Sequence, residues 1–226
     1  MNNVWKICLM SILLILLLEG CCSIKHPEGM PETRYYTLAY DPPSFDGFKP
    51  LPFVLRVYRF QVSPVYDSNK IIYQENPFQR NAYTYRRWRV NPGDLVACLL
   101  TRDLVQSGLF KAVFAPETGF SSSHMIEGVV DEFYERDEKD HWKAVLSINV
   151  ILAAENESDI CKSILFQKKY SLSEPCRQKN PQSLAQAMSK AMAGVSERVI
   201  MDVYHHLAGF RSETDLFPDI PPASSQ

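Results

Sequence analysis

The clearest alternation of apolar and polar positions lies in the second half of the chain. Segments 126–133 and 142–154 flank a charged run at 135–140. In the second arm the apolar side chains occupy every other position: Ala144, Leu146, Ile148, Val150, Leu152 and Ala154. A period of two puts these residues on one face of a strand. The pattern predicts a hairpin with a charged tip, which a further strand at 163–172 extends to an antiparallel meander.

Two segments have helical periodicity instead. The first starts at Asn91-Pro92-Gly93-Asp94, where Asn suits the N-cap and Pro the first turn, and it closes at Gly108. Its apolar stripe contains Val96, Leu99, Leu100, Leu104 and Val105. The second starts at Asn180-Pro181 and is predicted to end at Gly209, with a stripe of Leu184, Met188, Ala191, Val195, Val199 and Val203. Its length of roughly 42 Å is enough to lie across a sheet.

The remaining elements are shorter and complete an α/β (α+β) pattern. We predict a single domain over 34–209, with a mixed, largely antiparallel sheet packed by two main helices and a flexible tail at 210–226. Short strands are expected at 34–38, 53–62, 71–74, 82–86 and 110–114.

The N-terminus carries the most specific local pattern. Lys6 precedes an apolar run, Ile7–Leu18, and Glu19-Gly20-Cys21 follows it. At 1.5 Å per helical residue the run spans roughly 18 Å, short of the ~30 Å hydrocarbon core of a bilayer. This order of charge, apolar core and small residue is typical of a secretory signal peptide, here residues 1–20.

The residues before Cys21 resemble a bacterial lipobox, in which a small residue precedes a cysteine that is modified with lipid, palmitate included. Leu18, Gly20 and Cys21 fit, whereas Glu19 stands where Ala, Ser or Thr is usual. Since Cys22 and not Asp follows, the resemblance implies a lipid anchor on the outer membrane, facing the periplasm. Two alternatives stay open: a soluble secreted protein cut nearby by the ordinary signal peptidase, and an uncleaved anchor.

Composition bounds the rest. Removal of residues 1–20 leaves about 206 residues, enough for one domain with a substantial core or two small ones. Segment 21–33, which is polar and has two prolines in Ser23–Glu32, is expected to be a lipidated tether. The net charge of −2 does not favour a nucleic-acid partner, and 46% hydrophobic residues are ordinary for a globular protein.

The six cysteines have different expected roles. Cys8 leaves with the signal peptide, Cys21 is the anchor, and Cys98 is expected to be buried in its apolar helix. Cys161 and Cys176 are candidates for a disulfide, which an oxidising periplasm would preserve. The strand expected between them would hold them apart, so their pairing is left open.

No grouping of residues has the pattern of a catalytic or metal site, and no cofactor is expected. Asp202 and His206 share a helix face, but a third ligand at metal-binding spacing is missing. The acidic residues between 127 and 138 are interpreted as a solvated turn. Segment 121–124 (SSSH) has no nucleophile elbow and no partnered acid.

One segment has the composition of a contact surface. It interleaves aromatic rings with guanidinium groups: Tyr83, Tyr85, Arg86, Arg87, Trp88 and Arg89. Aromatic residues and arginine are enriched in the centres of protein interfaces. We therefore predict that this segment contacts a partner or a second copy of the chain.

With these residues in view, the chain resembles the ABC-type transport auxiliary lipoprotein family. The resemblance rests on the lipobox cysteine and on a few anchors: Tyr35, Tyr36, Leu38, 53–57, Tyr66, 71–73, Trp88, Pro92 and 108–110. It implies a fold similar to the N-terminal domain of TolB. It also implies a place beside MCE-domain proteins and permeases of an ABC system that moves lipid between two membranes.

The resemblance thus favours a non-enzymatic periplasmic adaptor that docks an MCE-type conduit to the outer membrane. An alternative is a lipoprotein that supports assembly of another outer-membrane machine, and a third is a hydrolase whose site is not recognisable. The apolar residues are committed to one sheet face and two helix stripes, which leaves few to line a lipid cavity. A collar, formed by homo-oligomerisation or by partner binding, is therefore expected in preference to a lipid carrier.

Overall fold

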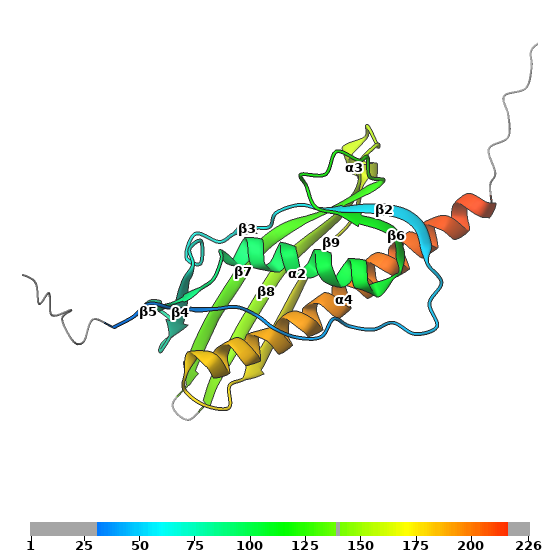
Figure 1. Cartoon of the computed structure of the whole chain (residues 1–226). Helices are drawn as coiled ribbons and strands as arrows, with labels where there is room; N and C mark the ends of the chain where they lie inside the picture. Colours follow the sequence, from blue (N-terminus) through cyan, green and yellow to red (C-terminus); the bar gives the residue numbers. More distant parts are fainter. Residues whose placement is uncertain (1–30, 139–140, 217–226) are drawn as a thin grey trace, which may run out of the picture. The chain divides into compact units, whose positions relative to one another are not determined.

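One long strand, β7, organises the sheet (Figure 1). The structure is a computed structural model that describes residues 31–138 and 141–216, with side chains as far as Gly209. Every element lies in the second of two compact units, which begins at Thr33. In chain order the elements are β1 (Arg34–Tyr36), β2 (Leu51–Val57), β3 (Gln61–Val62), β4 (Lys70–Gln74), β5 (Asn81–Trp88), α2 (Pro92–Ser107), β6 (Phe110–Phe114), β7 (His124–Glu138), β8 (His141–Ala154), α3 (Ile160–Ser163), β9 (Ile164–Pro175) and α4 (Pro181–Leu216).

Both edges of β7 are paired. β8 runs antiparallel along its whole length on one side, from His124 opposite Ala154 to Glu138 opposite His141. On the other side β2, β3 and β4 follow one another along β7, all parallel to it. β6 extends the sheet beyond β2, and β5 and then β1 extend it beyond β4. The predicted class, an α+β domain with a mixed sheet, is confirmed.

The meander β7–β8–β9 follows the alternation in the sequence. Five of the six apolar residues expected on one face of β8 are fully buried: Ala144, Leu146, Ile148, Val150 and Leu152. The strands stay paired as far as Glu138 and His141, and Glu135 is only 2% exposed, so the interpretation of these acids as a solvated turn was wrong for Glu135. Residues 139–140 lie outside the described residues. Asp137 accepts a hydrogen bond from Trp142 Nε1 at 2.5 Å and pairs with Lys179, which stabilises this end of the hairpin.

Both main helices pack against the sheet and contact each other. α4 contacts β8 and β9, whereas α2 contacts β6 and β7. The predicted N-cap of α2 is present, since Asn91 Oδ1 accepts from Gly93 N at 2.9 Å. Gly108 ends the helix in the left-handed conformation with φ 65°, which a residue with a side chain adopts only under strain.

Three expectations for the helices were wrong. Cys98 is exposed and Val105 is 54% exposed, because the core takes the opposite side of α2. α4 also passes through Gly209 and continues to Leu216, so residues 210–216 are helix and not a loop-like tail. A glycine inside a helix costs only about 1 kcal/mol, which the flanking helix formers offset. The rest of the expected tail, 217–226, lies outside the described residues.

The core lies between the helices and one sheet face. The whole predicted stripe of α4 is buried and belongs to one cluster: Leu184, Met188, Ala191, Val195, Val199 and Val203. A smaller cluster of Tyr66, Ile72, Tyr134 and Val145 forms apart from it. Within the described part of the chain, no helix is both long enough and apolar enough to cross a bilayer.

The packing of α4 leads to a first prediction. Val195 is fully buried, so Val195→Asp places an unpaired charge in the core and should lower the free energy of unfolding by several kcal/mol, about 3 or more. Arg198→Asp, at an exposed position of the same helix, should change it by about 0.5 kcal/mol or less. Urea denaturation of both variants measures the difference, and equal midpoints would show that α4 does not close the core.

Candidate functional site

The predicted contact segment, Tyr83 to Arg89, forms most of β5 and the residue after it. β5 lies between β4 and the short strand β1, which is the outermost strand on this side of the sheet. Because alternate residues of a strand point to opposite faces, the six predicted residues do not share one environment. The structure divides them into a buried part and an exposed part.

Trp88 belongs to the core and not to a contact surface. Its side chain is 1% exposed and packs edge-on against Phe133, with ring centroids 5.2 Å apart. Its backbone N–H donates to the carbonyl of Asn69 at 2.7 Å. The expectation that Trp88 is exposed was wrong, because a large aromatic ring at the end of β5 fills the space between the sheet and the helices.

Tyr83 is half-buried and bound to a carboxylate. Its hydroxyl donates to Glu135 at 3.2 Å, and its ring lies 4.8 Å from that of Tyr73. Burial raises the pKa of Glu135 above its ordinary value, although the hydrogen bond from Tyr83 lowers it. Burial and the neighbouring Glu135 charge likewise raise the pKa of Tyr83. This pair fixes β5 against β7 and leaves little of Tyr83 for a partner.

The other predicted residues stay at the surface and are joined there by a residue from β1. Tyr85 is 46% exposed, and Arg86 and Arg89 are exposed too. The guanidinium of Arg89 lies 5.7 Å from the ring centre of Tyr35, which is 52% exposed. Arg87 instead donates to Asn69 Oδ1 at 3.2 Å. We call the exposed residues of these two strands the basic-aromatic edge: Arg34, Tyr35, Tyr85, Arg86 and Arg89.

The turn between β4 and β5 adds a residue that the sequence did not single out. Phe78 is 98% exposed, the highest value among the exposed large hydrophobic residues of the described chain. Its backbone N–H donates to Asn76 Oδ1 at 3.1 Å, so the turn is ordered. In the sequence Phe78 was one more aromatic residue in a predicted turn, and no local signal separates an exposed ring from a packed one.

At the opposite end of β7, Arg56 holds a loop together. Its guanidinium donates to the carbonyls of Pro116, Thr118 and Phe120, while its Nε faces Ser122 and Glu155 at 3.1 and 3.3 Å. This arginine is only 8% exposed. These hydrogen bonds hold the β6–β7 loop against β2. The sequence analysis did not predict this cluster.

The serine-rich segment before β7 takes part in this fastening. Ser122 Oγ donates to Glu155 at 2.5 Å, so an acid does partner this segment, contrary to expectation. Ser123 Oγ lies 3.0 Å from His124 Nδ1, but it also donates to the carbonyl of Val54 at 2.9 Å. Burial lowers the pKa of His124. The two serine hydroxyls are thus hydrogen-bonded to the Glu155 carboxylate and to the backbone of Val54, and these bonds stabilise the loop.

The segment Asp202–His206 (DVYHH) forms a structural contact. Asp202 accepts from Lys168 Nζ at 2.6 Å and from Tyr170 Oη at 2.7 Å, which fastens α4 to β9. These hydrogen bonds hold the pKa of Asp202 below its usual value, although burial raises it. His206 Nδ1 lies 2.8 Å from the Asp202 carbonyl. The described residues contain no group of three or more His, Cys, Asp or Glu side chains placed to hold a metal ion.

Cys161 and Cys176 are both free thiols. Cys161 lies in α3 before β9, and Cys176 directly follows that strand. The 12 residues of β9 span roughly 40 Å at ~3.3 Å each, whereas a disulfide needs Cα atoms within about 7 Å. The pairing that the sequence left open is therefore not made, and burial raises the pKa of Cys176 to about 11. The predicted lipidation site, Cys21, lies outside the described residues.

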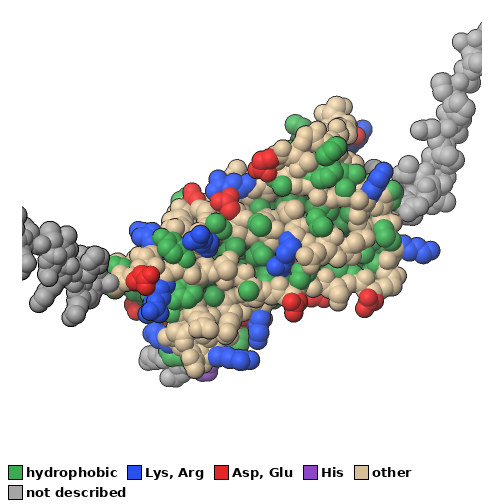
Figure 2. Space-filling view, in the orientation of Figure 1, with side chains coloured by type: hydrophobic (Ala, Val, Ile, Leu, Met, Phe, Trp, Pro, Cys, Tyr) green, Lys and Arg blue, Asp and Glu red, His purple; other side chains and the backbone are tan. Residues whose placement is uncertain are grey.

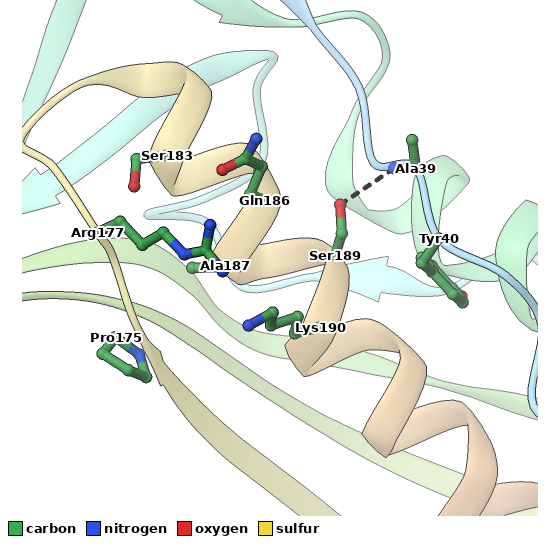
Figure 3. Close-up of a pocket in the computed structure, with 9 residues that line it drawn as sticks. All are labelled: Ala39, Tyr40, Pro175, Arg177, Ser183, Gln186, Ala187, Ser189 and Lys190. Atoms are coloured by element: carbon green, nitrogen blue, oxygen red, sulfur yellow. Dashed lines mark hydrogen bonds between the residues drawn. The ribbon is translucent and has the colours of Figure 1, made fainter.

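Each of the surface hollows found in the described chain has charged side chains in its lining. One, of about 260 Å3, lies beside α4, and its lining includes Arg177, Gln186 and Lys190 (Figure 3). Ala39 N donates to Ser189 Oγ at 3.0 Å at the side of this hollow. A larger one, of about 700 Å3, lies over Arg56 and Glu155. On the face seen in Figure 2, hydrophobic atoms are interspersed with charged ones. An acyl chain would need a continuous apolar lining instead.

Comparison with known proteins places the chain in context. Residues 36–200 match the model of a family described as the ABC-type transport auxiliary lipoprotein component. A Xanthomonas campestris protein of the DUF330 family is similar in structure, with a TM-score of 0.71 at 15% identity over 80% of this chain and 99% of that one. An uncharacterised protein gives a TM-score of 0.59 at 14% identity over 76% and 99%. These likenesses concern the fold, and no curated protein matches the chain.

The division of β5 into buried and exposed residues can be tested with two substitutions. Trp88→Ala removes a side chain from the core and should lower the free energy of unfolding by about 3–5 kcal/mol. Tyr85→Ala, three residues away on the exposed edge, should change it by about 0.5 kcal/mol or less. Denaturant midpoints measure both, and comparable losses would contradict the assignment of Tyr85 to a free surface.

Proposed function

The chain belongs to the ABC-type transport auxiliary lipoprotein family, and we propose that its role is that of a non-enzymatic adaptor anchored by lipid at Cys21. In this proposal the domain faces the periplasm from the outer membrane. It docks the conduit of an MCE-type lipid transport system, whose MCE protein and ABC permease are its partners. The family supports association with a transport system, and the finer assignments are the proposal.

One observation carries the choice of adaptor over carrier: the apolar faces of the long helix and of the central hairpin are packed into the core and line no cavity for a lipid. The full stripe of α4 and the inner face of β8 pack into one cluster. The hollow of about 480 Å3 beside the β4–β5 turn is lined by groups such as Glu75, Arg80 and Glu132, and the one of about 570 Å3 beside α4 by Lys168, Glu197 and Arg198. A domain of this kind binds partners with its surface and does not enclose lipid.

The tether supports the same role. Residues 21–33 would join the lipidated cysteine to a domain that begins at Thr33. Fixing a domain close to a membrane raises its effective concentration for any partner that reaches that membrane, with no new contact required. Since two or three acyl chains hold far more firmly than one, the attachment would be stable.

Lipidation is tested directly by metabolic labelling. Cells given labelled palmitate should incorporate it into the wild-type chain, and Cys21→Ser should abolish the label because the thioether has no acceptor sulfur. Cys22→Ser is the matched control and should keep the label. Incorporation that survives Cys21→Ser would sink the anchor assignment.

The adaptor role is tested by native mass spectrometry. The delipidated protein should carry no co-purified phospholipid, and it should form a defined complex with the MCE protein encoded beside it, either as an oligomer or as a single copy. A monomer that carries phospholipid and forms no complex would overturn the adaptor role in favour of a carrier.

A further inference from the structure

The turn between β4 and β5 presents an aromatic ring to solvent from an ordered backbone. Asn76 Oδ1 accepts a hydrogen bond from the backbone N–H of Phe78, and Asn76 Nδ2 donates to Gln79 Oε1 at 3.1 Å. The Gln79 amide donates in turn to Asn81 Oδ1 at 3.0 Å. Arg80 donates to the carbonyls of residues 77 and 79 and to Tyr66 Oη. A ring held out by a rigid turn loses little conformational freedom when something covers it.

The direction in which the chain enters the domain fixes which way this turn points. β1 and β5 are parallel, with Arg34 opposite Arg86. Traced back from Arg34, the chain therefore heads along β5 toward the start of that strand, which is the turn. The described chain begins at the end of the molecule where β4 and β5 lie (Figure 1). The first described residues and the turn thus lie on the same side of the domain.

Chain lengths show that the turn can reach the surface to which the tether is attached. From Arg86 back to Arg80 is six residues, or roughly 20 Å at ~3.3 Å per residue. From Thr33 back to Cys21 is twelve residues, which span at most about 40 Å. Laid along β5, a tether of this length would extend past the turn by at most about 20 Å, so a lipid on Cys21 can bring the membrane to the turn.

The side chains along β1 and the second half of β5 have the chemistry of a bilayer interface. The basic-aromatic edge contains two exposed tyrosines and three exposed arginines, and the guanidinium of Arg89 lies 5.7 Å from the ring centre of Tyr35. Aromatic rings favour the headgroup level, and arginines are attracted to anionic lipid phosphates. On the adjoining hairpin end the acids Asp137 and Glu138 are paired with Lys179 and Lys143. Glu75 and Glu132 also lie beside the turn, where Arg80 and Arg136 line the same hollow and offset their charge.

We propose that Phe78 and the basic-aromatic edge contact the bilayer that holds the lipid anchor, and that this second contact sets the orientation of the domain. The proposal rests on the lipid anchor proposed above. The anchor supplies the attachment, so a contact that is weak by itself is enough to choose one orientation. It places the β4–β5 end at the lipid and turns the loop held by Arg56, at the other end of β7, toward the periplasm.

The test places a fluorescent reporter at each end of the molecule. Phe78→Trp and Phe120→Trp replace exposed phenylalanines, the second of which is 68% exposed in the loop at the opposite end. Each mature lipidated variant is incorporated into vesicles of phosphatidylethanolamine and phosphatidylglycerol whose acyl chains carry bromine, a contact quencher of tryptophan. The wild-type protein supplies the background from Trp88 and Trp142.

With Phe78→Trp, emission from the introduced tryptophan should shift to the blue and lose half or more of its intensity in brominated vesicles. With Phe120→Trp it should do neither. Arg86→Glu with Arg89→Glu in the Phe78→Trp background should reduce the quenching, because the attraction to phosphate is reversed. Equal quenching at both sites, or none at either, would overturn the proposal.

Other outcomes point elsewhere. A blue shift of Phe78→Trp without bromine quenching, growing with protein concentration, would assign the surface to a second copy of the chain and contradict the membrane contact. Flotation of the vesicles tests the lipid anchor separately from the contact of the turn with the membrane. Protein that fails to float lacks a working anchor. Protein that floats without bromine quenching is anchored, but this turn does not orient it. Bromine quenching of Phe78→Trp in the floated protein supports both the anchor and the membrane contact.

Discussion

The pairing of β7 along both edges is the interaction on which the rest of the structure depends. β8 occupies one edge over its full length, and β2, β3 and β4 take successive positions along the other. The strand permits this because Gly128 lets a neighbour approach closely: a Cβ there would lie 2.7 Å from the Phe60 ring and closer still to the Asn149 carbonyl. With β7 in place, α2 packs against its inner face, and α4 packs against the neighbouring strands β8 and β9.

Local periodicity predicted those parts of the fold that local periodicity determines. The alternation in β8, the caps of α2 and the stripe of α4 each depend on residues near in sequence, and all three are present. The errors have non-local causes. The β7–β8 hairpin stays paired as far as Glu138, and Asp137 at this end binds Lys179, which is 42 positions away in the sequence. Cys98 is exposed because the sheet lies on the other side of α2.

The candidate surface was predicted only in part for the same reason. Composition marked the segment 83–89, but its exposure depends on which strand lies beside it. Trp88 is covered by Phe133 and Tyr83 is bound to Glu135, whereas Tyr35 joins the surface through the parallel pairing of β1 with β5. Phe78 stands out only in three dimensions, since a turn sequence does not reveal whether its ring meets another part of the chain.

The two ends of β7 are built differently, and this difference suits a tethered adaptor. At one end the turn holds Phe78 in solvent, and the basic-aromatic edge is exposed along β5 and β1, where the chain enters the domain. At the other end the buried guanidinium of Arg56 binds three carbonyls and Glu155, so the β6–β7 loop is held in one shape. A guanidinium this deeply buried is stable only when its donors are satisfied. The loop is thus held in place without an apolar core of its own, and Phe120 stacks on Phe114 at its surface while staying 68% exposed. A domain fastened to lipid at its first end would present this rigid second end to whatever approaches from the periplasm.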